Sequence, residues 1–350
     1  MLGRARLGAG RSIPWPAAVL IATAVAVIIA LTVVLLTQDG GGAADAGVVN
    51  ADAPGAGLDR WTVVQVDPNA PFLPTLANAE LAIGANRLSF TITGQNGRIR
   101  GDLTVRVGLF DLSSDPDLPV AEQFAQFIAY GAESPIPTNH AHADGASLSD
   151  DARYVGAGVY VVPAFFPMAG TWGLDFLITS EGGPEPPQTV LFRVEVRERG
   201  AAPRVGELAP SVASRTLVDE PDIRALTSDL TPEPGLYQVS IEEALQRDRP
   251  FVVIFATPAF CHSRTCGPSV EVVKEVWRSY AAQIDAIHVE VFENPADPDA
   301  LREAPAFLAW NLPSEPWVFV VDGDGRITAR FEGTITEAEL RGEVRRLVGE

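Results

Sequence analysis

The pattern of apolar and polar positions divides the chain into three regions with different periodicities. Residues 17–36 form an uncharged, almost wholly apolar run, which is long enough for a helix to cross the roughly 30 Å hydrocarbon core of a bilayer. From there to about residue 199, short segments alternate with a period near two, which is typical of half-buried strands. Beyond residue 233, strand-like and helix-like segments alternate, which favours an α/β domain.

The residues that flank the apolar run predict the orientation of a membrane anchor over 17–37. Arginines precede the run within residues 1–16, and no Lys or Arg follows it before Arg60. Because cytoplasmic flanks carry the excess of positive charge, we expect a single-pass protein of the cytoplasmic membrane with its C-terminal domains outside the cytoplasm. A cleaved signal peptide is the alternative, since residues 42–46 are small enough for a cleavage site.

Composition and periodicity divide the exported part further. Residues 38–57 are rich in Gly, Ala and Asp and predict a flexible tether. Residues 58–199 predict an all-β sandwich, because several short strands are separated by turn residues. The strands are expected at 61–66, 87–93, 103–110, 158–163, 171–178 and 189–196. Residues 200–232 contain several prolines and little periodicity, which indicates a linker.

A local motif in the β-rich region resembles a known family. A Gly-Val-Tyr sequence at 158–160 is followed by Pro-Met at 167–168 and by Gly-Thr-Trp at 170–172. This order is similar to the end of Ig-like domains of the YtkA/FixH kind. There, a strand that opens with Gly-x-Tyr precedes a Pro-Met turn and a strand led by Gly-x-Trp. The resemblance implies an Ig-like β-sandwich outside the membrane.

The C-terminal region, 233–350, predicts an α/β domain in some detail. Residues 251–256 form a continuous apolar run between prolines, which suits a strand buried on both faces. Further strands are expected at 286–292, 317–321 and 326–331, with a helix that follows Cys266 and a final helix at 337–348. Thr336 and Glu339 have the spacing of a capping box at the start of the final helix.

This order of elements resembles the thioredoxin fold over about 110 residues. The motifs that carry the resemblance are Cys-Gly-Pro at 266–268 and Glu-Pro-Trp at 315–317. In that family the proline that heads the third strand is cis and faces the thiol pair. The resemblance therefore implies a cis bond before Pro316, and a substrate groove shaped by Glu315, Pro316 and Trp317.

The chain departs from the thioredoxin family at its thiols. Ser269 stands where the family has its second cysteine, and of the two cysteines in the chain the other is Cys261, upstream of Cys266. A thiolate at a helix N-terminus is stabilised by exposed N–H groups and by the helix dipole, so Cys266 is the better candidate for a lowered pKa. The pair predicts thiol–disulfide exchange with protein thiols or disulfides and requires no cofactor. A structural disulfide is the alternative.

A second resemblance keeps peroxide chemistry open. Thr257-Pro258 before Cys261, with Cys266 after it, is similar to the bacterioferritin-comigratory peroxiredoxins, whose first cysteine attacks peroxide and whose second resolves it. One extra residue between Thr257 and Cys261 puts the activating hydroxyl out of register. Arg330 is the candidate for the activating arginine.

Metal binding is the remaining alternative. The Sco-type copper chaperones combine a thioredoxin fold on a membrane anchor with two cysteines and a histidine. By this resemblance copper is a candidate cargo, with His262 or His288 as the third ligand, and the protein would be a non-enzymatic binding protein of a membrane complex. His140 and His142 form a second candidate site, because side chains at i and i+2 on a strand share a face and imidazole suits copper or zinc.

Charge narrows the range of partners. The formal net charge is −19, which argues against nucleic acid as a partner, because binding requires Lys and Arg to displace counterions from phosphate. The hydrophobic fraction of 47% permits packed cores. Taken together, the sequence predicts a membrane-anchored, extracytoplasmic thioredoxin-like protein with its chemistry at Cys261 and Cys266.

Overall fold

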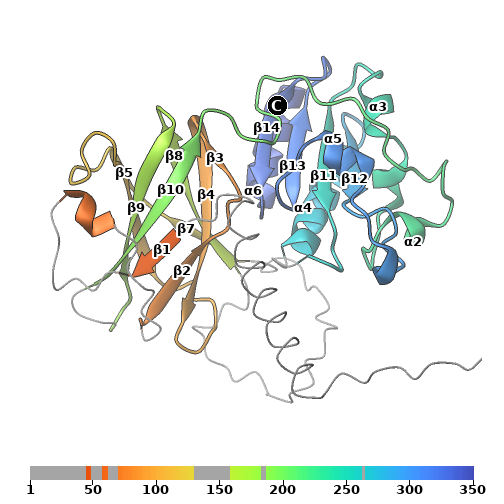
Figure 1. Cartoon of the computed structure of the whole chain (residues 1–350). Coiled ribbons are helices and arrows are strands. Elements are labelled where there is room, and N and C mark those ends of the chain that lie inside the picture. Colours follow the sequence, from red (N-terminus) through yellow and green to blue (C-terminus); the bar gives the residue numbers. More distant parts are fainter. Residues whose placement is uncertain (1–44, 49–56, 62–69, 130–157, 183–186, 262–264) are drawn as a thin grey trace, which may run out of the picture. The chain divides into compact units, whose positions relative to one another are not determined.

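The computed structural model describes residues 45–48, 57–61, 70–129, 158–182, 187–261 and 265–350, which Figure 1 draws as coloured ribbons. No helix within these ranges is long and apolar enough to cross a membrane. The apolar run at 17–36 that predicts the anchor lies outside the described residues.

The first folded region is a sandwich of two β-sheets. One sheet has the order β1-β10-β9-β5-β6, with β3 also paired to β10, and its pairs are antiparallel except β3 with β10. Its strands are β1 (Asp45–Val48), β3 (Leu81–Ala82), β5 (Thr104–Asp111), β6 (Ala121–Phe124), β9 (Gly170–Thr179) and β10 (Gln188–Arg197). The antiparallel second sheet has the order β2-β4-β8-β7. Its strands are β2 (Phe72–Leu76), β4 (Gly84–Gly94), β7 (Gln126–Ala129) and β8 (Gly158–Phe166).

The two sheets enclose one apolar core. Phe90 of β4 meets Phe176 of β9 edge-to-face, with ring centroids 4.7 Å apart, and both side chains are fully buried. The alternation that predicted the strands follows from this arrangement, because every second side chain faces the opposite sheet. The all-β sandwich is confirmed; the kinship with YtkA/FixH-type Ig-like domains stays a prediction.

Of the strand predicted at 61–66, only Trp61 lies among the described residues. Trp61 ends a short 3-10 helix, η1 (Gly57–Trp61), and packs on Phe110 with ring centroids 5.0 Å apart. An aromatic residue before a β-branched run suits either a strand or such a packed turn, and local sequence does not separate the two. Within the segment predicted as a tether, β1 pairs with β10, from Asp45 opposite Arg193 to Val48 opposite Val190.

The second folded region is an α/β layer with the order β12-β11-β13-β14 (Figure 1). β11 runs parallel to β12 and antiparallel to β13, which pairs antiparallel with β14. The strands are β11 (Phe251–Ala256), β12 (Asp285–Glu290), β13 (Trp317–Val321) and β14 (Ile327–Glu332). The helices are α2 (Ile223–Leu226), η2 (Pro234–Tyr237), α3 (Ile241–Ala244), α4 (Cys266–Tyr280), η3 (Pro298–Ala300), α5 (Pro305–Ala309) and α6 (Glu337–Val348). This is the order of elements that the thioredoxin resemblance implies.

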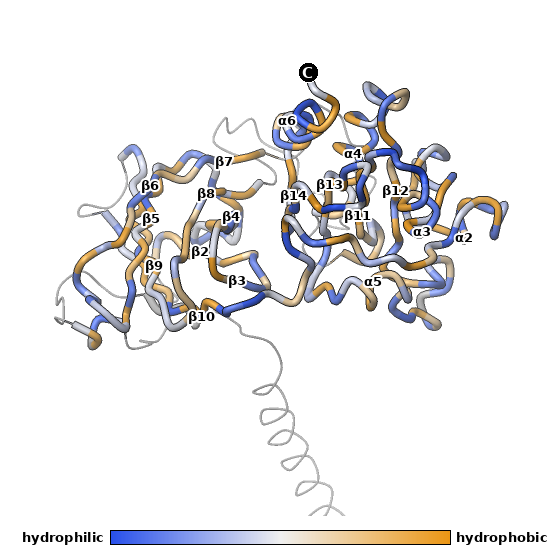
Figure 2. Tube along the Cα trace, turned by 90° about the horizontal axis from the view of Figure 1, so that it is seen from above, coloured by the Kyte–Doolittle hydropathy of each residue, from blue (hydrophilic) through white to orange (hydrophobic). Residues whose placement is uncertain are grey.

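Both faces of this sheet are covered, as the apolar run at 251–256 predicts. All six side chains of β11 are buried, and they alternate between two clusters. One cluster contains apolar side chains of α4 and α6, and the other contains those of α5. Figure 2 colours the same trace by hydropathy. The capping box is also confirmed, since Thr336 and Glu339 each bond to the other's backbone N–H at the start of α6.

Residues 200–232, which the sequence predicts as a linker, pack against the α/β sheet. Ala202 and Ala209 join the cluster on the α5 face. The backbone of this segment also runs beside β14, where Gly206 donates to the Ile327 carbonyl at 2.8 Å and Ile327 donates to the Glu207 carbonyl at 2.9 Å. Prolines hide this role from a periodicity analysis because they interrupt any regular pattern.

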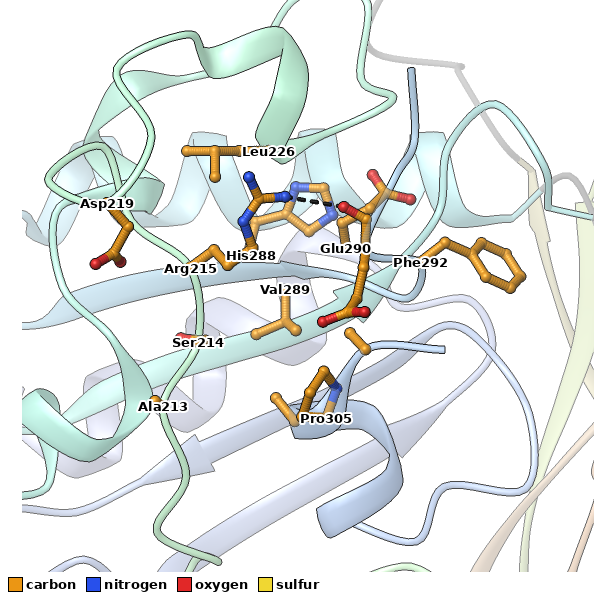
Figure 3. A pocket seen from close by; sticks show the side chains of 13 residues that line it. Ala213, Ser214, Arg215, Asp219, Leu226, His288, Val289, Glu290, Phe292 and Pro305 are labelled. Carbon is orange, nitrogen blue, oxygen red and sulfur yellow. Dashed lines mark hydrogen bonds between the residues drawn. The ribbon is translucent and has the colours of Figure 1, made fainter. Parts of the chain in front are cut away.

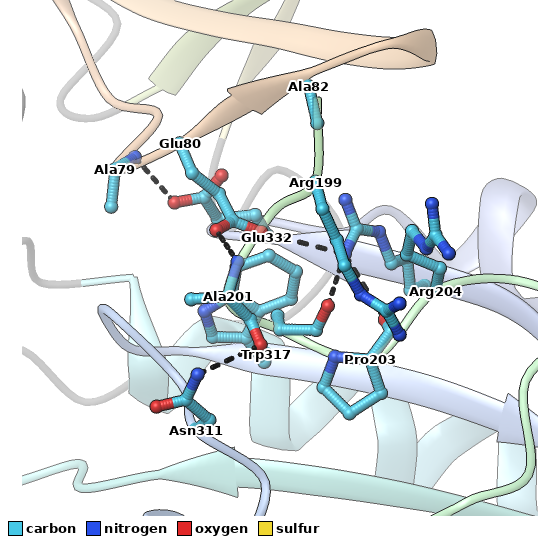
Figure 4. Close-up of polar contacts among 12 residues, drawn as sticks. Ala79, Glu80, Ala82, Arg199, Ala201, Pro203, Arg204, Asn311, Trp317 and Glu332 are labelled. Carbon is cyan, nitrogen blue, oxygen red and sulfur yellow. Dashed lines mark hydrogen bonds and ion pairs between the residues drawn. The ribbon is translucent and has the colours of Figure 1, made fainter. Parts of the chain in front are cut away.

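Polar contacts join the loop before β3 to the α/β region (Figure 4). Glu332 of β14 accepts from the backbone N–H of Ala79 at 2.6 Å and from the side chain of Asn78 at 3.1 Å. Glu80 accepts from the backbone N–H of Ala201, and Arg330 lies 3.6 Å from its carboxylate. Burial raises the pKa of Glu332, and the hydrogen bonds oppose this effect.

Candidate dithiol site

Cys261 and Cys266 form a disulfide at one end of β11. Their Cα atoms are 6.0 Å apart, within the usual range for a disulfide. Cys266 is the first residue of α4 and is fully buried, whereas Cys261 lies before the helix and is partly exposed. The two sulfurs therefore differ in access to solvent, and an external reactant reaches Cys261 first.

The first backbone N–H group of α4 forms a hydrogen bond with the sulfur of the partly exposed Cys261. The backbone N–H of Cys266 donates to the Sγ atom of Cys261 at 3.3 Å. The sequence correctly places Cys266 at the helix N-terminus, but its first N–H group points to the other cysteine. A thiolate on Cys261 gains from this donor and from the helix dipole, while burial opposes ionisation of Cys266.

The residue pair that precedes β13 lies against the disulfide. The Glu315–Pro316 bond is cis, as the thioredoxin resemblance implies. A carboxylate oxygen of Glu315 and the Sγ atoms of both cysteines all lie within 4.8 Å of one another. Glu315, expected as part of a substrate groove, is thus a direct neighbour of the sulfurs.

Trp317, the third residue expected to shape the groove, belongs to the core. Its side chain is 1% exposed and lies in the cluster on the α5 face of the sheet, whereas the disulfide lies on the α4 face. The indole stacks on Phe319 with centroids 5.7 Å apart and donates to the Ser314 hydroxyl at 3.0 Å. The side chains of a strand alternate between faces, so Trp317 cannot share the face of the disulfide with Val318.

The carboxyl group of Glu315 is held in an environment that favours its protonated form. Burial raises its pKa to about 7, the charge of Glu290 adds to the increase, and a hydrogen bond from the Thr257 backbone opposes it. One of its buried carboxylate oxygens has no hydrogen-bond partner. An oxygen of this kind lowers the free energy of unfolding, because it has lost its hydrogen bonds to water and gained none in the protein.

Glu290, the last residue of β12, is a second buried carboxyl near this site. It accepts from the backbone N–H of Ser228 at 2.7 Å and from the hydroxyl of Thr227 at 3.1 Å. Burial raises its pKa, and these hydrogen bonds lower it. Among the residues that the structure describes, no Lys, Arg or His forms an ion pair with Glu290 or Glu315. The buried Lys274 of α4 pairs instead with Asp229 and Glu271, at 2.5 Å and 2.7 Å.

Burial favours the neutral form of His288, and both of its ring nitrogens are engaged in hydrogen bonds. Its Nδ1 atom lies 2.6 Å from the Tyr237 hydroxyl, and its Nε2 atom lies 3.1 Å from the Ala256 carbonyl. Burial lowers the pKa of His288 to about 4. Because Nε2–H donates to the carbonyl and Nδ1 accepts from the hydroxyl, the ring offers no free lone pair to a metal. His288 is therefore not available as the third copper ligand. His140, His142 and His262 lie outside the described residues.

A pocket of about 260 Å³ is lined in part by Glu290 (Figure 3). Its lining includes His288 and Glu290 from β12, together with Arg215 from the segment before α2. The guanidinium of Arg215 donates to the carbonyls of Glu293 and Ala225 at 2.9 Å and 3.0 Å, so it connects this segment to the loop that follows β12.

The arginine proposed for peroxide activation is engaged elsewhere. Arg330 donates to the carbonyls of Ala202 and Pro203 at 3.1 Å and lies over the Trp317 ring, with 5.4 Å to its centroid. That ring belongs to the α5 face of the sheet, away from the face that carries the disulfide. The structure does not bring Arg330 to the sulfurs.

The chain was compared with protein-family models, curated sequences and solved structures. No family model matches the chain, and no curated protein sequence matches it. Among solved structures, the chain is similar to a thiol:disulfide interchange protein of the thioredoxin family from Chlorobium tepidum TLS, with 15% identity and a TM-score of 0.30. The match covers 42% of this chain and 100% of that one. A TM-score this low does not establish a common fold. The likeness of the C-terminal region to the thioredoxin fold therefore rests on its strand order, on the start of α4 at Cys266 and on the cis bond before Pro316.

Proposed function

We propose that this protein exchanges disulfides with protein thiols through Cys261 and Cys266. The observation that carries the proposal is the asymmetry of the pair. Cys261 is partly exposed and receives the N–H of Cys266, while Cys266 is buried beside it at the start of α4. In this arrangement the accessible thiolate can attack a partner disulfide, and the shielded thiol can then resolve the mixed disulfide that forms.

The exchange proceeds in two steps that balance. The Cys261 thiolate attacks one sulfur of a partner disulfide, forms a mixed disulfide and releases the first partner thiolate. Cys266 then loses its proton and attacks the Cys261 sulfur, which forms the internal disulfide and releases the second partner thiolate. The partner gains two electrons and the protein dithiol loses two. The reverse sequence oxidises a partner dithiol.

The location of this chemistry forms part of the proposal. Residues 17–36 have the length and composition of a membrane anchor, and the arginines before them favour a cytoplasmic N-terminus. The dithiol would then work outside the cytoplasm, where disulfides form and persist. The partners would be exported proteins that gain, lose or rearrange disulfides.

Two single-cysteine variants of the full-length protein test the mechanism. Cys266→Ser, incubated with a peptide that contains a disulfide, is expected to accumulate a mixed disulfide at Cys261, measured by mass spectrometry. Cys261→Ser is expected to react at least about tenfold more slowly, because its remaining thiol is buried. If neither variant forms a mixed disulfide faster than an unfolded control peptide does, the bond is structural and the proposal fails.

A further inference from the structure

The dithiol site gathers ligand atoms of a kind that a metal ion requires. The Sγ atoms of Cys261 and Cys266 and a carboxylate oxygen of Glu315 lie within 4.8 Å of one another. A buried oxygen of Glu315 has no hydrogen-bond partner. Once the disulfide is reduced, the site holds two potential thiolates and a carboxyl, with a second carboxyl at Glu290 close enough to raise the pKa of Glu315. No cation among the described residues is paired with either carboxyl.

We propose that the reduced protein binds a divalent cation of the zinc class through Cys261, Cys266 and Glu315. The disulfide form lacks the two thiolates and does not bind it, so the oxidation state of the cysteine pair controls the site. The proposal shares one premise with the proposed function, namely that the disulfide can be reduced.

The geometry fits a tetrahedral ion with three protein ligands. With metal–ligand bonds of about 2.0 to 2.3 Å, the ligand atoms of such an ion lie roughly 3.5 to 3.8 Å apart. In the oxidised protein the two sulfurs are bonded to each other, and the carboxylate oxygen of Glu315 lies within 4.8 Å of both. After reduction, the sulfurs separate by rotation of the two cysteine side chains, and Glu315 has only a short distance to move. Cys261 is partly exposed, which leaves an entry path and a fourth position for water or a partner's side chain.

The ligand types select among metals. Two thiolates exclude calcium and magnesium, which prefer oxygen ligands throughout. Copper(I) also binds paired thiolates but gains little from a carboxylate, which is a harder ligand. Zinc accepts sulfur and carboxylate oxygen together. Glu315 is therefore the residue that distinguishes this site from a simple two-thiolate copper site.

The overall reaction balances in two stages. An external dithiol reduces the Cys261–Cys266 disulfide, gives up two electrons and two protons, and becomes a disulfide itself. The cation then displaces one proton from each of the two thiols, and one more from Glu315 where that carboxyl is protonated. The divalent cation would then be bound by two thiolates and one carboxylate, which together carry three negative charges.

The test measures Zn²⁺ affinity of the full-length protein by competition with a chromogenic chelator, in a phosphine reductant that does not bind the metal. The reduced wild type is expected to bind one Zn²⁺, and the oxidised protein none. Glu315→Gln is expected to bind about 100-fold more weakly, because even partners outside the ligand set change affinity 10- to 100-fold. Glu315→Asp keeps the carboxyl on a shorter side chain and should fall between the two.

Two controls separate a ligand role from a structural one. Glu275→Gln removes the same charge from an exposed position on α4 and is expected to leave Zn²⁺ affinity within about twofold of the wild type. Copper(I) affinity of Glu315→Gln is expected to equal that of the wild type, because copper(I) needs only the thiolates. Co²⁺ in place of Zn²⁺ should give a thiolate charge-transfer band in the reduced wild type, with a changed ligand-field spectrum in Glu315→Gln.

Three results would overturn the proposal. They are equal Zn²⁺ binding by the reduced wild type and a Cys261→Ser/Cys266→Ser variant, equal binding by the oxidised protein, and a loss of copper(I) affinity in Glu315→Gln as large as the loss for Zn²⁺. Failure of the thiol exchange assay leaves these measurements intact, because the chemical reductant opens the disulfide without a partner protein. The two proposals therefore fail separately.

Discussion

Two pairs of carboxyls, each with one member on a strand of the α/β sheet, differ in what surrounds them. Glu80 and Glu332 meet at the contact with the sandwich, where Arg330 lies 3.6 Å from Glu80 and the backbone of Ala79 donates to Glu332 (Figure 4). Glu315 lies beside the disulfide, and the charge of Glu290 acts on it. The described residues provide hydrogen bonds to Glu290 but no ion pair to either carboxyl.

The difference predicts a structural role for the first acid pair and a chemical role for the second. A buried carboxyl with a guanidinium and amide donors holds two segments together. A buried carboxyl with a raised pKa, an unpartnered oxygen and a disulfide beside it costs stability, and such groups gather at sites of chemistry. The comparison predicts opposite effects when each pair is altered.

The largest expected effect comes from the structural pair. Arg330→Met keeps much of the apolar bulk over Trp317 but leaves Glu80, whose side chain is 1% exposed, without its counter-ion. We expect the free energy of unfolding to fall by about 3 kcal/mol, measured by urea unfolding at neutral pH. The additional change Glu80→Gln removes the stranded charge and should restore part of the loss. A loss below about 1 kcal/mol would show that this pair does not hold the contact.

The pH dependence of stability tests whether His288 provides a cation near Glu290. Burial lowers its pKa from 6.5 to about 4, so the unfolded chain binds the proton more tightly. The contribution of neutral His288 is fully present above pH 6.5 and is lost as pH falls toward about 4, by about 3 kcal/mol in total. Asp229 and Lys274 act on this pKa in opposite directions.

The measurement compares the wild type with His288→Gln across that range of pH. The difference between their free energies of unfolding should be constant above pH 6.5 and should shift in favour of the variant below it. Equal slopes for the two proteins would mean that folding leaves the pKa of His288 unchanged, and a shift in favour of the wild type as pH falls would mean that the folded protein holds the proton on His288 as a counter-ion.

The smallest expected effect has the opposite sign. Burial and the charge of Glu290 raise the pKa of Glu315 from 4.5 to about 7, so the folded protein loses stability as pH rises through that interval. In the oxidised, metal-free protein, Glu315→Gln should raise the free energy of unfolding by about 1 kcal/mol at pH 8. This figure is well below the full value of the pKa shift, because the group is partly exposed to solvent.

The gain from Glu315→Gln should disappear below about pH 4.5, where the wild-type carboxyl is protonated in both states. Glu275→Gln, an exposed change on α4, should stay within about 0.5 kcal/mol of the wild type at either pH. A destabilisation of the Glu315 variant that is equal at both pH values would place Glu315 with the structural acids.

Much of the α/β region could be predicted because its signals are local. The apolar run at 251–256 and the Thr336–Glu339 capping box each lie within a few residues, and both are present as expected. The pairing of Asp45–Val48 with β10 was not predicted, because it joins segments that are far apart in the chain. The linker assignment overlooked Ala202 and Ala209, whose burial depends on β14.

The residues of the candidate site also fall into two groups, those with a local sequence signal and those brought together only by the fold. Motifs that lie within a few residues indicated Cys261, Cys266 and Pro316. The proximity of Glu315 to Glu290 was not predicted, because it arises only when β12 and β13 pair on either side of β11. The burial of Trp317 on the α5 face could not be predicted, because it depends on which face of β13 each side chain occupies. Local sequence indicates many of the strands, but the pairing of the strands decides which side chains meet.

The central claim is that the cysteine pair exchanges electrons with partner thiols, and the redox potential of the Cys261–Cys266 couple tests it most directly. The full-length protein would be equilibrated with glutathione buffers and its oxidation state read by mass spectrometry. We predict a potential between about −120 and −270 mV, the range of known thiol exchangers. A potential below about −300 mV would identify a structural bond and contradict the account.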